Sequence, residues 1–200
     1  MNRIKGRGLL AAVVAVTAFP AFAQFSESYN FLKAVRDRDG AKVQSVIQNP
    51  SSTAINARDA RTGEGALHIL VRGRELSWLR VLLANGARPD LQDNEGNTAL
   101  AAAAQIGWVE GAQALLARGA GVDVPNGRGE TPLILAVQRR DLAMVRLLMA
   151  RGANPNRTDS AAGYSALDYA RRDNRSAAIV RLLQEARPAQ AVQGPPAPRR

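Results

Sequence analysis

Four similar hexapeptides recur along the chain at a nearly constant interval. They read GALHIL at 65–70, TALAAA at 98–103, TPLILA at 131–136 and SALDYA at 165–170. Their first residues are therefore 33, 33 and 34 positions apart. A period in this range is typical of stacked supersecondary units, each of which buries its apolar face only against its neighbours. The spacing predicts an elongated array and not a single globular core.

Each repeat carries the local signals of two short helices. Thr98, Thr131 and Ser165 stand where the first helix begins, and their hydroxyls can accept hydrogen bonds from the free backbone amides of the first turn. The second helix contains paired leucines and ends at a glycine, a common residue at the left-handed end of a helix. These terminal glycines, again 33 positions apart, are Gly86, Gly119 and Gly152.

A turn precedes each first helix. Two residues before each hexapeptide stands a glycine, where a tight turn requires a backbone of positive φ. These turn glycines are Gly63, Gly96, Gly129 and Gly163. The only histidine, His68, lies beside the first of these turns. We interpret it as a side chain that braces the turn by hydrogen bonds, and not as a metal ligand or a base.

This pattern closely resembles the ankyrin repeat, a 33-residue unit with the signature T-P-L-H-x-A. The resemblance spans four units, at 59–92, 93–125, 126–158 and 159–187. Residues 24–58 repeat the two-helix plan with poorer fidelity, as a degenerate N-terminal capping repeat would. The resemblance implies an all-α solenoid of about five helix-turn-helix units with β-turn tips.

The sequence departs from the family pattern in a few places. The signature histidine survives only as His68, and Ala60 stands where the family favours aspartate. Arg140 replaces the usual glycine between the two helices, while Asn174 is expected to take a left-handed backbone at the same place in the last unit. That unit also carries one extra residue near 160–162.

The two ends of the chain lack the repeat. Residues 1–23 read as a secretory signal peptide, with basic residues before an apolar run at 9–18. The run is too short to span a bilayer, which takes about 20 residues. An Ala-Phe-Ala motif predicts cleavage after Ala23, the alternative being an uncleaved anchor. We therefore expect a bacterial protein of the periplasm or the exterior, with no stable membrane anchor after cleavage. Residues 188–200 are proline-rich and predicted to be disordered.

Composition narrows the classes of function. The absence of cysteine excludes disulfides, thiolate catalysis and thiolate-bound metals. With one histidine and no converging carboxylates, the sequence predicts a non-catalytic protein without a cofactor or a metal site. The net charge of +10 by itself favours nucleic acid as a partner. However, the basic residues are not clustered with aromatic ones, and export would remove most nucleic-acid targets.

The family resemblance implies a concave groove, lined by the turn tips and by the ends of the first helices, that binds a partner protein. Carried onto this sequence, the groove positions are Arg61, Thr62, Glu64, Arg72, Asn94, Glu95, Asn97, Gln105, Arg128, Glu130, Gln138, Arg139, Tyr164, Arg172 and Asp173. Trp108 is read either as a packing residue or as an exposed aromatic anchor of the kind enriched at binding hot spots.

The predicted function is protein binding in the bacterial envelope. We expect a monomer whose arginines engage carboxylates on an acidic partner. Three alternatives stay open at this point. In the first, the protein is an inhibitor, immunity factor or chaperone-like accessory of one periplasmic enzyme or toxin. In the second, it is a secreted effector directed at a host. In the third, the basic charge reflects amino-acid composition and has no role in binding.

One packing contact is also predicted. Trp78 and Gly111 are 33 positions apart and so occupy equivalent places in the second helices of neighbouring repeats. Stacking places equivalent helices side by side. We therefore expect the absent side chain of Gly111 to make room for the Trp78 ring.

Overall fold

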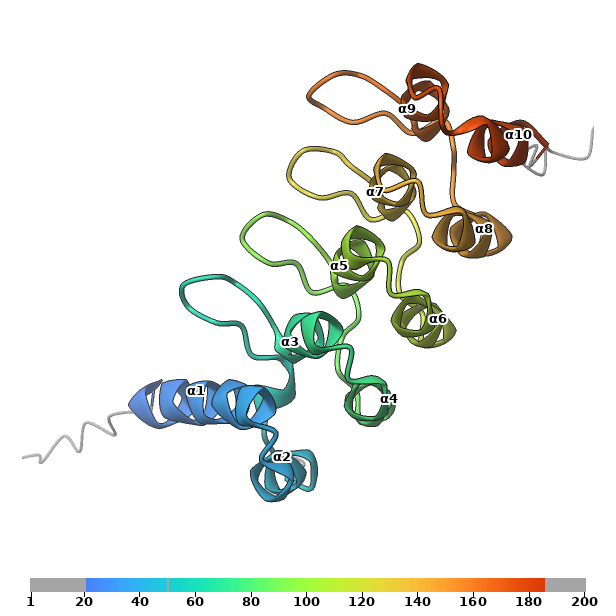
Figure 1. The fold of residues 1–200 in the computed structure, drawn as a ribbon. Coiled ribbons are helices and arrows are strands. Elements are labelled where there is room, and N and C mark those ends of the chain that lie inside the picture. Colours follow the sequence, from blue (N-terminus) through green and yellow to red (C-terminus); the bar gives the residue numbers. More distant parts are fainter. Residues whose placement is uncertain (1–20, 50, 186–200) are drawn as a thin grey trace, which may run out of the picture.

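The computed structural model describes residues 21–49 and 51–185. Nearly all of the predicted signal peptide, the last residues of the final repeat and the whole predicted tail at 188–200 lie outside these described residues. The described part is a row of five helical hairpins stacked side by side (Figure 1). The prediction of an all-α solenoid of about five helix-turn-helix units is confirmed.

Each hairpin pairs a first helix with a second helix. The first helices are α1 (Ala21–Asp37), α3 (Ala66–Gly73), α5 (Ala99–Ile106), α7 (Pro132–Gln138) and α9 (Ala166–Arg172). The second helices are α2 (Gly40–Ile47), α4 (Leu76–Ala84), α6 (Val109–Ala117), α8 (Leu142–Ala150) and α10 (Ala177–Glu185). A short 3-10 helix, η1 (Ala54–Asn56), follows α2. The two kinds of helix form two parallel rows, and long turns project from the row of first helices (Figure 1).

The predicted helix starts are present as hydrogen bonds. The hydroxyl of Thr98 accepts a bond from the Ala101 amide at 3.2 Å. Thr131 and Ser165 accept equivalent bonds at 3.3 Å and 3.2 Å. At the other end of the second helices, the three terminal glycines have φ values of 89°, 84° and 85°. These local signals therefore act as the sequence indicated, and they set the length of each helix.

Between the helices of a hairpin, one residue usually takes a left-handed backbone. Gly107 does so with φ 66°, and Arg140, which replaces the usual glycine, does so with φ 61°. The prediction for Asn174 is wrong, since its φ is not positive. There α9 ends at Arg172, and the carboxylate of the next residue, Asp173, accepts bonds from the Arg175 amide and the Ser176 hydroxyl. These bonds turn the chain without a left-handed residue.

The turn tips are joined to one another along the stack. The Asn94 amide donates to the Thr62 carbonyl at 3.0 Å, and the Gly127 amide donates to the Glu95 carbonyl at 2.8 Å. A third bond of the same kind joins the last two tips. The tips thus form a continuous hydrogen-bonded edge, which holds neighbouring repeats in register.

The first of these tips corrects the alignment of the repeat. The carboxylate of Asp59, and not position 60, accepts the backbone amides of Arg61 and Thr62. Asp93 accepts tip amides in the same way in the next repeat. The interpretation of Ala60 as a lost aspartate is therefore wrong. The tip of this repeat is one residue longer, as is the tip of the last repeat.

A continuous apolar core runs between the two rows of helices. Leu100 and Leu133 of the first helices and Leu82 and Leu115 of the second helices are completely buried. Each of them packs among residues of its own and of adjacent repeats, so that no single hairpin encloses a core by itself. Within the described residues, no helix has the length and hydropathy needed to cross a bilayer.

The predicted contact between Trp78 and Gly111 is wrong. A Cβ atom added to Gly111 would lie within 2.5 Å of three ring atoms of Trp108. The Trp108 ring folds back over the first turn of α6, and only 4% of the residue is exposed. Trp108 is therefore a packing residue, and its reading as an exposed anchor is also wrong. Trp78 is half-buried and approaches Gly40, where an added Cβ would lie 3.3 Å from the ring.

Candidate functional site

A groove of about 510 Å³ opens beside the turn tips along helices α3 and α5. We call it the α3–α5 groove. It is lined by Arg61, Thr62, Glu64, His68, Arg72, Asp93, Asn94, Glu95, Asn97, Ala102, Gln105 and Ile106. Every groove position that was predicted for these two repeats is in this lining. The structure therefore brings together the first half of the predicted set.

The floor of the α3–α5 groove is open because one side chain is small. Ala102 of α5 stands at the position that Ile69 holds in α3 and Leu135 holds in α7. The side chain of alanine ends at Cβ, so the space above it stays unfilled. Sequence analysis did not identify Ala102 or the neighbouring Ile106 as groove residues. The comparison of residues 69, 102 and 135 along the repeat is the signal that would have found them.

The predicted groove residues are paired with one another. In each of four repeats, the residue before the helix cap contacts the residue eight positions later, in the last turn of the first helix. The pairs are Glu64–Arg72 at 2.8 Å, Asn97–Gln105 at 3.3 Å, Glu130–Gln138 at 3.1 Å and Tyr164–Arg172 at 2.7 Å. In the last pair, the Arg172 guanidinium also lies 4.5 Å from the centroid of the tyrosine ring. The groove therefore has a pre-organised polar rim.

Asn97 is the centre of this rim. Only 4% of it is exposed. Its side-chain oxygen accepts bonds from Gln105 and from Asn126 of the next repeat, and its amide nitrogen donates to Glu95 at 3.2 Å. Asn97 thus orients the polar groups of two repeats, which leaves little of its own side chain for a partner.

Two other predicted residues link repeats. Arg139 donates to the Gln105 carbonyl at 2.9 Å, at the end of the preceding first helix. Asp173 pairs with Arg140, and the hydrogen bond from this guanidinium is the main cause that lowers the pKa of Asp173 to about 2. These contacts join neighbouring repeats to one another.

Unlike the predicted residues above, two predicted arginines at the turn tips have free side chains. The guanidinium groups of Arg61 and Arg128 are exposed and make no hydrogen bond or ion pair with the described residues. Carboxylates of Glu64, Asp93 and Glu95 line the groove beside Arg61. The groove therefore carries both signs of charge. Its free cation is Arg61 at the first tip, and Arg128 stands at the third tip, outside the groove lining.

His68 braces the turn, as predicted, and also joins two repeats. Its Nδ1 atom accepts a bond from the Gly65 amide at 3.2 Å, and its Nε2 atom donates to the Asn97 carbonyl at 2.9 Å. Only 3% of the residue is exposed. Burial is the largest influence and lowers its pKa, although the bond to Asn97 and the charge of Asp93 oppose that effect.

We expect the stability of the protein to fall as the pH drops below the ordinary histidine pKa of 6.5. In that range the unfolded chain binds a proton at His68 more readily than the folded chain does, so protonation favours unfolding. Urea unfolding measured between about pH 7 and pH 5 checks this, since shifted carboxylates respond only at lower pH. A His68→Gln variant should lose this slope. An unchanged slope in the variant would assign it to another group.

Among the described residues, no three histidine, aspartate or glutamate side chains converge in a way that could hold a metal ion. What the site offers is a rigid polar rim, an open floor at Ala102 and free guanidinium groups at the tips.

Comparison with known families agrees with this architecture. A profile described as ankyrin repeats (3 copies) matches residues 31–126. A second profile, described as ankyrin repeats (many copies), matches residues 115–170. The two matches together extend from residue 31 to residue 170, which is well over half of the chain.

Proposed function

Because this chain belongs to the ankyrin-repeat family, we propose that it is a non-catalytic module that binds a partner protein in the α3–α5 groove. Ankyrin repeats indicate a protein–protein interaction module, and proteins built from them are generally non-catalytic. The observation that carries the choice of this groove is its open floor at Ala102 beneath a rim of paired polar side chains.

The groove supports a partner segment of defined chemistry. Ala102 and Ile106 offer an apolar floor for an apolar side chain. The free guanidinium groups of Arg61 and Arg128 would bind carboxylates of the same partner, because a guanidinium forms two parallel hydrogen bonds with a carboxylate. The rim pairs already hold their side chains in place, which reduces the entropy lost on binding.

The cellular location and the oligomeric state are also part of the proposal. We propose a monomer in the bacterial periplasm or exterior, and the signal-like residues 1–23 support this location. A dedicated accessory role for one periplasmic enzyme or toxin would use the same groove. Measuring the activity of the captured partner with and without this protein separates that role from a general scaffold.

Photocrosslinking in cells tests the groove. With a photoreactive amino acid at position 94 on the groove rim, we expect crosslinks to one recurrent protein, identified by mass spectrometry. Ala102→Leu should abolish these crosslinks, because it places on the groove floor the side chain that Leu135 carries in the next repeat. The same match to Leu135 predicts that the variant folds with little change in its thermal midpoint.

Position 143 is the matched control, since Ala143 is exposed on helix α8 of the other row. A photoreactive group there should not capture the same protein, and Ala143→Leu should leave the crosslinks from position 94 intact. Crosslinks that persist in the Ala102→Leu variant would show that the partner does not use the α3–α5 groove.

A further inference from the structure

The row of second helices carries arginines that no other described residue neutralises. From α4 to α10, each second helix or its C-terminal cap presents at least one exposed arginine. These residues, which we call the outer arginine row, are Arg80, Arg118, Arg146, Arg151 and Arg181. None of their guanidinium groups makes a hydrogen bond or an ion pair within the described part of the chain.

Most of the described arginines elsewhere in the stack make a side-chain contact. Arg74 donates to the Ile106 carbonyl at 2.8 Å, and Arg72 pairs with Glu64. The remaining engaged arginines bind carboxylates, carbonyl groups or a tyrosine, and they are Arg36, Arg38, Arg58, Arg139, Arg140, Arg172 and Arg175. The fold thus engages most arginines of the first helices and of the connections, with Arg61, Arg88, Arg128, Arg157 and Arg171 as exceptions, whereas it leaves every arginine of the outer row free.

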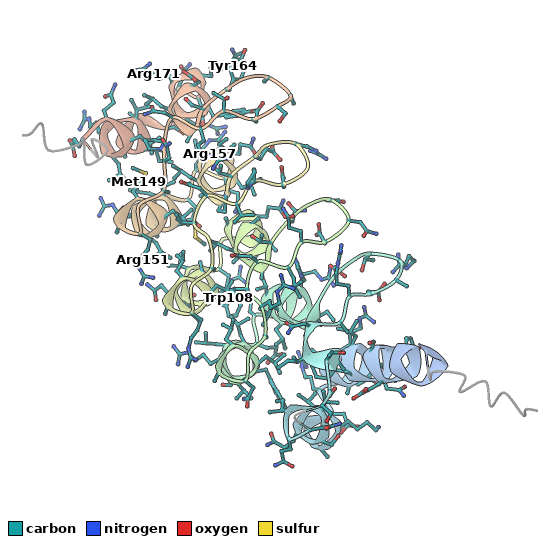
Figure 2. The ribbon with its side chains drawn as sticks, turned by 180° about the vertical axis from the view of Figure 1, so that it is seen from behind. Trp108, Met149, Arg151, Arg157, Tyr164 and Arg171 are labelled. Atoms are coloured by element: carbon teal, nitrogen blue, oxygen red, sulfur yellow. The ribbon has the colours of Figure 1, made fainter. Side chains whose placement is uncertain are left out.

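Three members of the outer row meet in one place. Arg80 of α4, Arg118 at the end of α6 and Arg151 at the end of α8 line a groove of about 380 Å³. The rest of its wall is Leu83, Gln113 and two alanines, so no carboxylate faces the three guanidinium groups. Figure 2 shows Arg151 on the outward side of the second helices, away from the turn tips. The groove is therefore a concentrated positive site on the face opposite the tips.

Few opposite charges lie near this row. Glu110 and Glu185 are the exposed carboxylates on helices α4, α6, α8 and α10, and neither lines the groove. The apolar exposure is also small, because Val81 is the one large hydrophobic residue of these helices that is substantially exposed, at 39%. A ligand of this face is therefore held by its negative charge and not by the insertion of apolar side chains.

We propose that the outer arginine row docks the protein onto an anionic phospholipid surface, with Arg80, Arg118 and Arg151 binding headgroup phosphates. A guanidinium matches the geometry of phosphate oxygens through two parallel hydrogen bonds. The row extends across four neighbouring helices, so it meets several headgroups at once, as a membrane surface provides. This contact leaves the α3–α5 groove, which lies on the other row, accessible to a protein partner.

Sedimentation with lipid vesicles tests the proposal. The protein is used as purified from cells, and every variant is prepared in the same way, so that all share one N-terminus. We expect stronger binding to vesicles that mix phosphatidylcholine with phosphatidylglycerol than to phosphatidylcholine alone. This preference should disappear at about 1 M salt, where charges are screened within about 3 Å.

Two double variants that each remove two positive charges distinguish binding by the outer arginine row from binding by net charge alone. Arg118→Gln with Arg151→Gln should weaken the binding to phosphatidylglycerol vesicles about 30-fold. Arg61→Gln with Arg128→Gln, at the turn tips, should leave it nearly unchanged. None of the four side chains has a partner in the described residues, so both variants should keep the wild-type thermal midpoint.

Three results would overturn the proposal. The first is an equal loss of binding in the two double variants, which would show that only total charge matters. The second is the absence of any preference for phosphatidylglycerol. The third is binding of soluble polyglutamate through Arg118 and Arg151 without binding of vesicles, which would assign the face to an acidic protein.

Discussion

Gly111→Ala is expected to lower the free energy of unfolding by about 3 kcal/mol, the upper part of the range for overpacked cores. An added Cβ would lie within 2.5 Å of the Cε3, Cζ3 and Cδ2 atoms of Trp108. The ring is buried, so moving it away from an added Cβ displaces the side chains packed around it. Accommodation therefore requires a shift of packed helices. Urea unfolding followed by circular dichroism measures the effect.

A loss of stability in Gly111→Ala is opposite in sign to the change that helix propensity alone predicts. Alanine in the middle of a helix is normally more favourable than glycine by about 1 kcal/mol. Gly73→Ala is the matched control, because the nearest atoms to an added Cβ there belong to the flexible side chain of Glu75. This control should be neutral or stabilising.

Repeating Gly111→Ala in a Trp108→Ala background tests whether the Trp108 ring causes the steric clash. Trp108→Ala is itself expected to cost about 3–5 kcal/mol, the usual loss for a buried aromatic residue. In that background, Gly111→Ala should become stabilising, since the ring is gone. In a Trp78→Ala background it should remain destabilising. Equal stability of Gly111→Ala and the wild type would refute the packing argument.

Asp159→Ala is expected to cost about 3 kcal/mol, because it removes the acceptor of several hydrogen bonds at once. One carboxylate oxygen accepts bonds from the backbone amides of Ala161, Ala162 and Gly163, and the other accepts a bond from the Tyr169 hydroxyl at 2.6 Å. Only 4% of Asp159 is exposed. Hydrogen exchange of the last repeat should show the loss, since these bonds hold its turn tip.

Asp159→Asn is the matched variant, and it should cost only about 1 kcal/mol. Asn126 already fills the equivalent place one repeat earlier, where its side-chain oxygen accepts the amides of Arg128 and Glu130. If the alanine and asparagine variants are equally stable, the tip does not depend on these bonds.

The charge of Asp159 adds a dependence on pH. Burial alone raises its pKa, but the hydrogen bonds from Tyr169 and the three amides together lower it below 3.8. The stabilisation is thus complete above the pKa of the unfolded chain and is lost as the pH falls through the lower, folded pKa. The asparagine variant should lack this acid-dependent loss.

The local parts of this fold were readable from the sequence because each depends on residues close in the chain. Thr98 caps a helix through an amide three residues away, and Gly86 ends one through its own backbone freedom. The register of the repeat then identified eight of the ten polar residues that line the α3–α5 groove, from Arg61 to Gln105, and missed His68 and Asp93.

Contacts between side chains were harder to predict from the sequence. Periodicity paired Trp78 with Gly111, whereas the ring at that glycine belongs to Trp108, three residues earlier at the N-terminal cap of the same helix. The aspartate position of the first full repeat was misread by one residue, since in its longer tip Asp59, and not residue 60, accepts the tip amides. Repeat equivalence states which backbones are neighbours but not which rotamer a large side chain takes.

By itself, the sequence determined the repeat, the two-helix plan and the position of the concave polar face, because period, caps and glycine turns act within a few residues. Only the tertiary structure decided which arginines are free. Arg74, Arg139 and Arg140 reach carbonyl or carboxylate groups of a neighbouring repeat, whereas the outer arginine row reaches none. That distinction depends on distances between repeats, which no local pattern encodes.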